Sequence, residues 1–284
     1  MSAIGLLTVL VTATPIEVQG HRGARAVRPE NTLAAFAYAL GVGVDTLELD
    51  LAVTKDDVVV VSHDPHLTPE RCLGPKGVIL ATPVAIRELT LEQVKAYDCG
   101  SLKNPRFPKQ VLAPAKIPTL DEVFAHVKAS KHRAAKRVHF NLETKIFPAH
   151  PEFTPTPKEF AELVVESVRR HGMVARTIVQ SFDYRTLEAV KAMAPKIRIA
   201  MLQPDGLVPL VPVAKALRAE IVSPHHEWIL KADVEALHAA GVRVVPWTAN
   251  DEAAWARLID LGVDGIITDD PAALINYLEK RGRR

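Results

Sequence analysis

The sequence predicts an α/β protein: a TIM (β/α)8 barrel with a small insertion after its second strand. Short β-branched runs alternate with longer helical patterns, as in parallel sheets joined by crossover helices. Eight such strand runs can be identified, together with eight helical segments. The length of 284 residues, 48% of them hydrophobic, also suits one large barrel. We therefore expect residues 16–284 to form a single barrel domain.

The predicted elements follow one another along the chain in the expected alternation. The strands are expected at residues 16–19, 44–51, 138–143, 176–180, 198–202, 220–222, 242–247 and 264–267. The first helix should begin near Asn31, a good N-cap, and stop at Gly41. The other helices are expected at residues 120–129, 157–171, 184–194, 208–217, 231–240, 252–261 and 271–280.

The alternation is interrupted between the second strand and the helix at 120–129. This stretch holds an extra strand at 58–61 and then an irregular insertion at 64–118. Long loops are usually functional, and a loop after a barrel strand borders the active-site mouth. We expect the insertion to cap or border a substrate cleft. It also contains both cysteines, Cys72 and Cys99. These are either two free thiols or a disulfide, which would require an oxidising compartment.

Charge and hydropathy exclude two classes of protein. The 35 basic and 33 acidic residues give a net charge of +2, without the basic excess of a nucleic-acid binder. The apolar run at 4–11 is too short to cross a bilayer, so we expect no stable membrane insertion. Residues 1–15 are either an arm leading into the barrel or a signal segment. Nothing in the sequence specifies an oligomeric state.

Two carboxylates lie on one face of the second predicted strand. Glu48 and Asp50 are two residues apart, so both point away from the face that carries the intervening leucines. Leucines facing the helices leave the carboxylates inside the barrel. Buried like charges are costly unless they are neutralised. Either a hard cation such as Mg²⁺ or Ca²⁺ or salt bridges to neighbouring strands would do this.

The third predicted strand repeats this pattern. Asn141, Glu143 and Lys145 share a face. Glu143 could complete a metal site with Glu48 and Asp50, and Lys145 could meet an anion. The alternative is an internal Glu143–Lys145 ion pair. Three inward carboxylates on adjacent strands favour the metal site.

Two histidines are expected at the rim of the barrel. His21 and Arg22 end the first strand between Gly20 and Gly23, and His63 follows the extra strand. Histidine performs acid–base chemistry near neutral pH, and arginine offers a bidentate fork to phosphate. A lone histidine is more often a surface or core residue. Two of them beside a carboxylate-lined barrel favour catalysis.

Polar and aromatic residues end two further strands. Gln180 and Phe182 end the fourth strand and would line the pocket. Trp247 ends the seventh strand, where its ring could pack on a small polyol or, alternatively, lie in the core.

Taken together, these motifs closely resemble those of the glycerophosphodiester phosphodiesterases, from about residue 19 to residue 271. The shared segments, in order, are Gly20-His21-Arg22-Gly23, Pro29-Glu30-Asn31-Thr32, Glu48-Leu49-Asp50, Ser62-His63-Asp64, Glu143-Thr144-Lys145, Gln180-Ser181-Phe182 and Trp247-Thr248. The resemblance implies a TIM barrel with an insertion after strand two. It also implies metal ligation by three carboxylates, Glu48, Asp50 and Glu143, and an acid–base pair of His21 and His63.

The resemblance implies further roles around that centre. Arg22 and Lys145 would hold the phosphate, Trp247 would line the glycerol site, and Glu30 would orient its neighbours. The insertion and the N-terminus resemble those of an exported bacterial branch. We therefore expect a periplasmic or secreted protein, with the cytoplasm as the alternative.

The sequence thus predicts an enzyme that uses one divalent cation, Mg²⁺ or Ca²⁺, to hydrolyse small glycerophosphodiesters to glycerol 3-phosphate and an alcohol. One rival is a lysophospholipase D-like or sphingomyelinase D-like phosphodiesterase. Its lipid substrate would require an exposed apolar patch, for which the candidates are Leu67, Leu73, Val78, Ile79 and Leu80. The other rival is a non-catalytic phosphoester-binding barrel.

Overall fold

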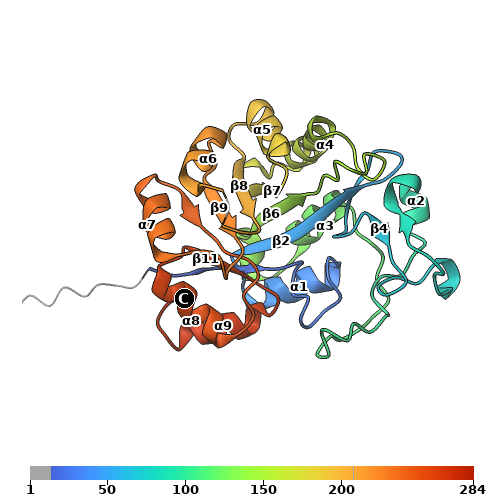
Figure 1. Cartoon of the computed structure of the whole chain (residues 1–284). Coiled ribbons are helices and arrows are strands. Elements are labelled where there is room, and N and C mark those ends of the chain that lie inside the picture. The colour runs from blue at the N-terminus through green and yellow to red at the C-terminus, as the bar shows by residue number, and fades with distance from the viewer. Residues whose placement is uncertain (1–13, 207) are drawn as a thin grey trace, which may run out of the picture.

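The computed structural model describes residues 14–206 and 208–284. Residues 1–13 of the expected arm or signal segment lie outside the described residues. Figure 1 shows a central group of strands surrounded by helices, with the insertion to one side of the barrel. No helix within the described ranges is long and apolar enough to span a bilayer.

Eight parallel strands form the barrel in the order β10-β9-β8-β7-β6-β2-β1-β11. Their bounds are β1 Glu17–Gly20, β2 Thr46–Val53, β6 His139–Thr144, β7 Thr177–Ser181, β8 Arg198–Gln203, β9 Ile221–Pro224, β10 Arg243–Val244 and β11 Gly265–Thr268. Backbone hydrogen bonds join the two ends of this order, from the Asp264 amide to Val244 (2.9 Å) and from the Ile267 amide to Pro246 (2.9 Å). The predicted barrel is confirmed.

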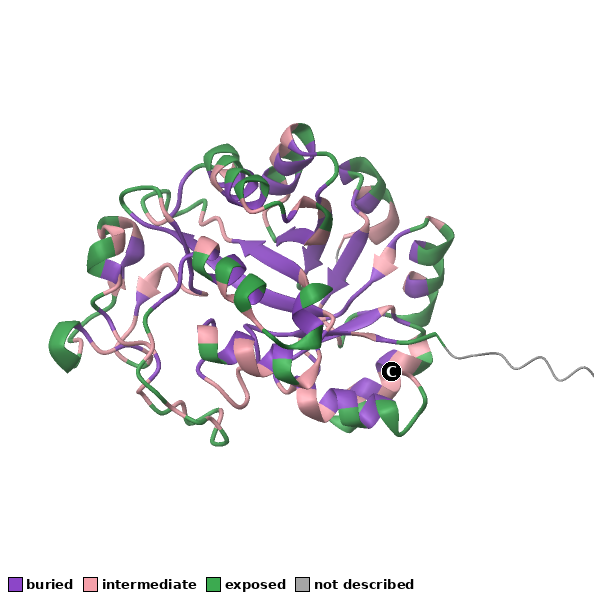
Figure 2. Cartoon of the chain, turned by 180° about the vertical axis from the view of Figure 1, so that it is seen from behind, coloured by how far each residue is buried: buried purple, intermediate pink, exposed green. Residues whose placement is uncertain are grey.

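Helices cover the outside of the strands. They are α1 Leu33–Val42, α3 Leu120–Ala129, α4 Pro157–Arg170, α5 Tyr184–Met193, α6 Leu210–Leu217, α7 Lys231–Ala239, α8 Glu252–Leu261 and α9 Pro271–Glu279. Two of them, α3 and α4, begin with capping boxes, which satisfy free amides of the first turn. Figure 2 shows buried strands and helices whose outer faces are exposed.

The core has two layers that together place the polar residues. Leu47, Leu49 and Leu51 of β2 are buried on the helix side, as their alternation with the carboxylates predicts. Inside the barrel, a small apolar cluster comprises Ile178, Ala200, Ile221, Val245 and Ile267, and Trp247 packs against it. Glu48 and Asp50 alternate with these leucines and therefore point into the barrel, whereas a separate polar group of Glu17, Thr46 and Arg243 lies at the N-terminal ends of the strands.

Several predicted element ends are wrong, among them those of helix α1 and the seventh strand. Helix α1 is capped by Thr32, whose side chain accepts a hydrogen bond from the Ala35 amide, and it ends at Gly43 rather than at Gly41. Asn31 instead adopts a left-handed backbone with φ 58°, and its side-chain amide donates to Asp50. The seventh strand is also shorter than expected, Arg243–Val244, although the amides of Val245 and Trp247 still donate to the neighbouring strand at Val222 and Pro224 (both 3.0 Å).

The insertion contains short elements and its own core. β3 Val59–Val61 pairs antiparallel with β2, and β4 His66–Leu67 pairs with β5 Val84–Ala85. The short helices of the insertion are η1 Pro75–Gly77, η2 Ile86–Glu88 and α2 Leu91–Val94. Two other short helices, η3 Arg133–Lys136 and η4 Val174–Arg176, lie outside the insertion, later in the chain. Its buried cluster is Ala52, Val60, Leu67, Cys72, Ile86, Val94, Tyr97 and Ile117. Cys72 and Cys99 form a disulfide, which decides between the two alternatives.

The apolar patch considered for a lipid substrate does not form as a unit. Leu67 is buried in the insertion's core, and Leu73 and Leu80 are partly buried. Only Val78 and Ile79 remain exposed, because the cluster around the disulfide takes up the other apolar side chains.

Candidate active site

Three carboxylates meet at the ends of β2 and β6. The parallel register places Asp50 opposite Glu143 and Glu48 opposite Asn141. One oxygen from each of Glu48, Asp50 and Glu143 lies within 4.8 Å of the other two, and all three residues are buried. The strand alternation thus gives the arrangement that the sequence predicts.

Two basic side chains and one side-chain amide surround Asp50. Its Oδ2 lies 3.1 Å from the Arg22 Nε and accepts from the Asn31 amide nitrogen at 2.9 Å, while its Oδ1 lies 3.0 Å from the Lys145 Nζ. Burial alone would raise the pKa of Asp50, but Lys145 and Arg22 hold it well below the usual range. Lys145 also pairs with Glu143, so the predicted internal ion pair is present as well.

Glu48 is neutralised less completely. It accepts from the Arg22 backbone amide at 2.8 Å and from the Gln180 side chain at 3.0 Å. Among the described residues it has no ion pair with a lysine or arginine side chain, although the His21 Nε2 is 3.9 Å away. Burial, together with the charges of Asp50 and Glu143, raises the pKa of Glu48 well above its usual value. Burial also raises the pKa of Glu143.

His21 is held by a carboxylate from the opposite end of the chain. Its Nδ1 lies 2.6 Å from the Asp269 Oδ1, at the end of β11. Asp269 also accepts from the Arg25 Nε at 2.7 Å and from the Asn250 side chain at 2.8 Å. Burial is the main cause that lowers the pKa of His21 to about 4, and Arg22 adds to the effect. His21 is therefore neutral near pH 7.

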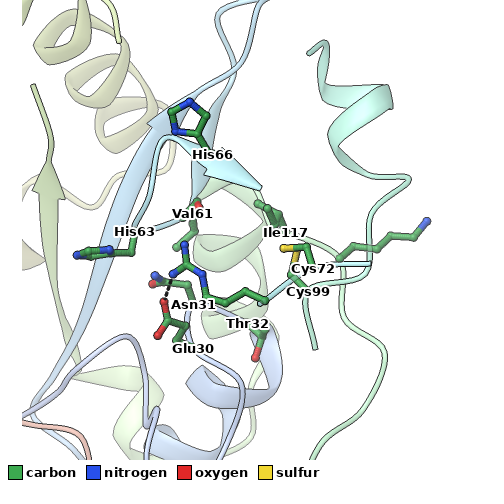
Figure 3. Close-up of a pocket in the computed structure, with 12 residues that line it drawn as sticks. Glu30, Asn31, Thr32, Val61, His63, His66, Cys72, Cys99 and Ile117 are labelled. Carbon is green, nitrogen blue, oxygen red and sulfur yellow. Dashed lines mark hydrogen bonds and ion pairs between the residues drawn. A yellow bond between two sulfur atoms is a disulfide. The ribbon is translucent and has the colours of Figure 1, made fainter. Parts of the chain in front are cut away.

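His63 is also engaged by an aspartate at its Nδ1, as His21 is. The Asp64 Oδ1 lies 2.7 Å from this nitrogen, and Asp64 is paired with Arg71 of the insertion. Arg71 also contacts Glu30 at 2.7 Å, and Glu30 in turn contacts Arg22 at 2.8 Å. Figure 3 shows Glu30 and the disulfide near one another on the insertion side, with His63 directed away from them. The insertion thereby borders the site, as expected.

One cavity of about 290 Å³ collects most of the predicted site residues. It is lined by His21, Arg22, Arg25, Glu48, His63, Glu143, Lys145, Gln180, Phe182, Leu202, Trp247, Thr248 and Ile267. Asp50 and Glu30 do not line it: Asp50 is fully buried and reaches the site through Arg22 and Lys145, whereas Glu30 contacts Arg22. Trp247 donates from Nε1 to the Ser223 carbonyl and meets Phe182 edge to face.

The sequence reasoning missed three residues of this site. Asp269, Arg25 and Asn250 form the hydrogen-bonded group behind His21. Asp269 follows the last apolar residues of the eighth strand, where inward polar residues had already marked other strand ends. That position was a usable signal for Asp269. Arg25 and Asn250 lie in irregular segments whose spacing carries no such signal.

An arm of the insertion, residues 101–113, packs against the loop that follows β1. The Val111 amide donates to the Val27 carbonyl at 3.0 Å, and Gln110 donates to the carbonyl of Arg25 at 2.6 Å. The Phe107 ring lies 4.9 Å from the Arg25 guanidinium. The arm thus supports Arg25 and, through it, Asp269.

Comparisons with known proteins agree with this geometry. Residues 21–273 match the model of the glycerophosphoryl diester phosphodiesterase family. A glycerophosphodiester phosphodiesterase of Caldanaerobacter subterraneus is 34% identical over 93% of this chain and 98% of its own. A mouse lysophospholipase D is 28% identical over 91% of this chain and 84% of its own. A crystal structure from Silicibacter pomeroyi, assigned to the same phosphodiesterases, has a TM-score of 0.88 and 30% identity over 95% of both chains. The chain belongs to the glycerophosphoryl diester phosphodiesterase family.

Proposed function

We propose that this protein hydrolyses glycerophosphodiesters to glycerol 3-phosphate and an alcohol, with one divalent cation, Mg²⁺ or Ca²⁺. The observation that carries the proposal is a single cavity at which buried carboxylates, two histidines and the basic side chains of Arg22, Arg25 and Lys145 meet. Family membership and the named activity of the 34% identical relative support the same reaction.

Glu48, Asp50 and Glu143 are the residues that would hold the cation. Their donors are all carboxylate oxygens, which suit hard cations. The raised pKa of buried Glu48, which has no lysine or arginine partner in the described chain, also fits a site that takes additional positive charge. A bound cation would supply charge stabilisation at a phosphoryl oxygen.

Arg22 and Lys145 are placed to hold the phosphate. Burial alone would lower the pKa of each, but neighbouring carboxylates raise both pKa values, so the side chains remain charged. Both line the cavity beside the histidines. Fixed charges aimed at the reacting group stabilise the transition state without reorganisation.

The two histidines would act as the acid–base pair. Asp269 and Asp64 each engage a histidine through Nδ1, so Nε2 is the nitrogen left for chemistry. One histidine would remove a proton from the nucleophile, and the other would protonate the leaving alcohol. The two carboxylates would hold both rings in position.

The nucleophile would be the glycerol hydroxyl next to the phosphoester: its oxygen bonds to phosphorus, the bond to the alcohol breaks as a histidine protonates the alcohol, and water then opens the resulting cyclic phosphate to glycerol 3-phosphate. An intramolecular attack has most of its orientation already fixed by the substrate. A substrate analogue that lacks this hydroxyl should bind but turn over far more slowly. If the deoxy analogue reacted as fast as the parent compound, direct attack by water would replace this step.

The test of the function is a metal titration of choline release, which both substrates give, with glycerol 3-phosphate identified as the second product of glycerophosphocholine. The protein is first stripped with a chelator and then supplied with Mg²⁺ or Ca²⁺, using glycerophosphocholine and its acylated form. We expect release that depends on the cation and favours the deacylated substrate. Preference for the acylated form would point to a lysophospholipase D. Binding without turnover would point to the non-catalytic barrel.

We also propose that the protein works outside the cytoplasm. The Cys72–Cys99 disulfide supports an oxidising compartment. Cell fractionation after thiol trapping tests this, and a cytoplasmic protein with two free thiols would contradict it.

A further inference from the structure

A second cavity of about 220 Å³ adjoins the first. It is lined by His63, Asp64, Pro65, Glu143, Thr144, Lys145, Ile146, Phe147, Phe182 and Asp183. Four of these residues also line the first cavity: His63, Glu143, Lys145 and Phe182. A phosphodiester bound at the shared residues would therefore be able to extend into both cavities.

The second cavity has an aromatic wall that is held in place by its neighbours. The ring of Phe147 meets that of Phe153 at a centroid distance of 6.2 Å, and Phe153 meets His66 of the insertion at 4.5 Å, in both cases edge to face. The His150 amide donates to the Phe147 carbonyl at 2.8 Å. These contacts join the loop after β6 to β4 and fix Phe147 beside Phe182.

The two cavities differ in charge. The first is lined by Arg22, Arg25 and Lys145 against two glutamates. In the second, Lys145 is the only lysine or arginine among the lining residues, against Glu143, Asp64 and Asp183. Burial alone would raise the pKa of Asp64, but its hydrogen bond to His63 keeps it low, and the hydrogen bond from Arg185 lowers that of Asp183. Both aspartates are therefore charged near neutral pH, and each is also paired with an arginine outside the lining, Asp64 with Arg71 and Asp183 with Arg185.

We propose that the second cavity receives the leaving alcohol and favours an alcohol that carries a quaternary ammonium group. This inference rests on the proposed function. Aromatic faces with nearby carboxylates are the recurring recognition chemistry for such cations. The more cationic first cavity, which contains Trp247, then takes the glycerol phosphate portion. The alcohol oxygen lies between the two, on the side of His63.

The lining disfavours a polyol as the leaving group. Apart from the charged groups, the wall consists of Pro65, Ile146, Phe147 and Phe182, which offer no hydrogen bonds from their side chains, together with Thr144. Hydroxyls of a polyol that face this apolar part of the wall would lack partners, which carries a desolvation penalty. A trimethylammonium group presents only methyl groups to the same wall.

The first arm of the test uses the wild-type protein and two substrates of the same shape. Glycerophosphocholine is compared with the ester of 3,3-dimethylbutanol, in which carbon replaces the ammonium nitrogen. We expect kcat/KM to favour the choline ester by about tenfold, in the range of a partly desolvated cation–π contact. Equal values of kcat/KM for the two esters would overturn the proposal. This experiment uses only wild-type protein, so its result does not depend on whether a variant folds.

The second arm removes the aromatic face. Phe147→Leu keeps an apolar side chain, and we expect it to lower kcat/KM for glycerophosphocholine about fivefold and for the neutral ester less than twofold. Trp228→Leu is the matched control, because this exposed aromatic residue lines neither cavity. Equal losses on both esters in Phe147→Leu would contradict the subsite. Failure of the proposed function is distinct, because wild-type protein would then hydrolyse neither ester.

Discussion

Each histidine of the site is engaged by a carboxylate, but the two carboxylates come from different parts of the chain. Asp64 is the neighbour of His63, so the sequence itself places them together. Asp269 reaches His21 only because β11 lies beside β1 in the barrel. Sequence spacing could therefore show the first pair and not the second.

Asp269→Asn should lower kcat while leaving KM within about threefold. The asparagine can retain the contact with Asn250 but does not stabilise a protonated His21, and in comparable triads such a change costs on the order of 10²–10⁴-fold in rate. Steady-state kinetics on glycerophosphocholine measures this. The control is Asp270→Asn, since Asp270 caps α9 and asparagine caps equally well. A matching rise in KM would contradict a positioning role for Asp269.

Glu48→Gln and Glu143→Gln should each abolish most cation binding and lower activity by at least about 100-fold. Each change removes a ligand charge while preserving shape. Calorimetric titration with Ca²⁺ and the activity assay would be carried out on the same samples. Exposed Glu227→Gln serves as the control. Full wild-type activity after exhaustive chelation is the result that would refute the metal site.

At the scale of the element, alternation along β2 and β6 was sufficient to predict the carboxylate cluster. The pattern fixes which face each side chain takes, and neighbouring parallel strands fix the rest. It was harder to predict which of two neighbouring residues caps a helix. Asn31 and Thr32 are both good caps, and the contact of Asn31 with Asp50 leaves the cap to Thr32. The pairing of Cys72 with Cys99 depends on distance, which spacing alone does not give.

Replacing Cys72 and Cys99 by serine should lower the free energy of unfolding by about 3 kcal/mol, the scale of the entropy released when a loop of this size is opened. The two cysteines are 27 residues apart, and the loop between them contributes Ile86, Val94 and Tyr97 to the insertion's small core. Urea denaturation measures the change, and wild-type protein under reducing conditions should match the double variant. Two alkylated thiols in the untreated protein would show that the bond is absent.

At the scale of the whole molecule, the barrel was predictable because its alternation extends along nearly the whole chain. The insertion was predictable in position but not in form, since its short strands and helices fall below the length at which periodicity is informative. Its role could be seen only in three dimensions, where Arg71 and the arm at 101–113 reach the residues around both histidines.

Saturating Ca²⁺ or Mg²⁺ should stabilise the folded protein. A ligand that binds only the folded state adds about 2.7 kcal/mol at a concentration one hundred times its Kd. For a chain of this size, that corresponds to a rise in Tm of roughly 4–5 °C. Thermal denaturation with and without the cation measures it. Glu48→Gln should show no rise, and an equal rise in that variant would mean that the cation binds elsewhere.

The contact between His21 and Asp269 spans 248 positions of the chain. A ribosome therefore releases the histidine 248 residues before its orienting carboxylate. Until β11 has been synthesised, the nascent polypeptide lacks the partner of His21, however well its first strands have paired. The proposed acid–base pair is thus completed only after β11, and a product truncated before that strand lacks the His21–Asp269 contact.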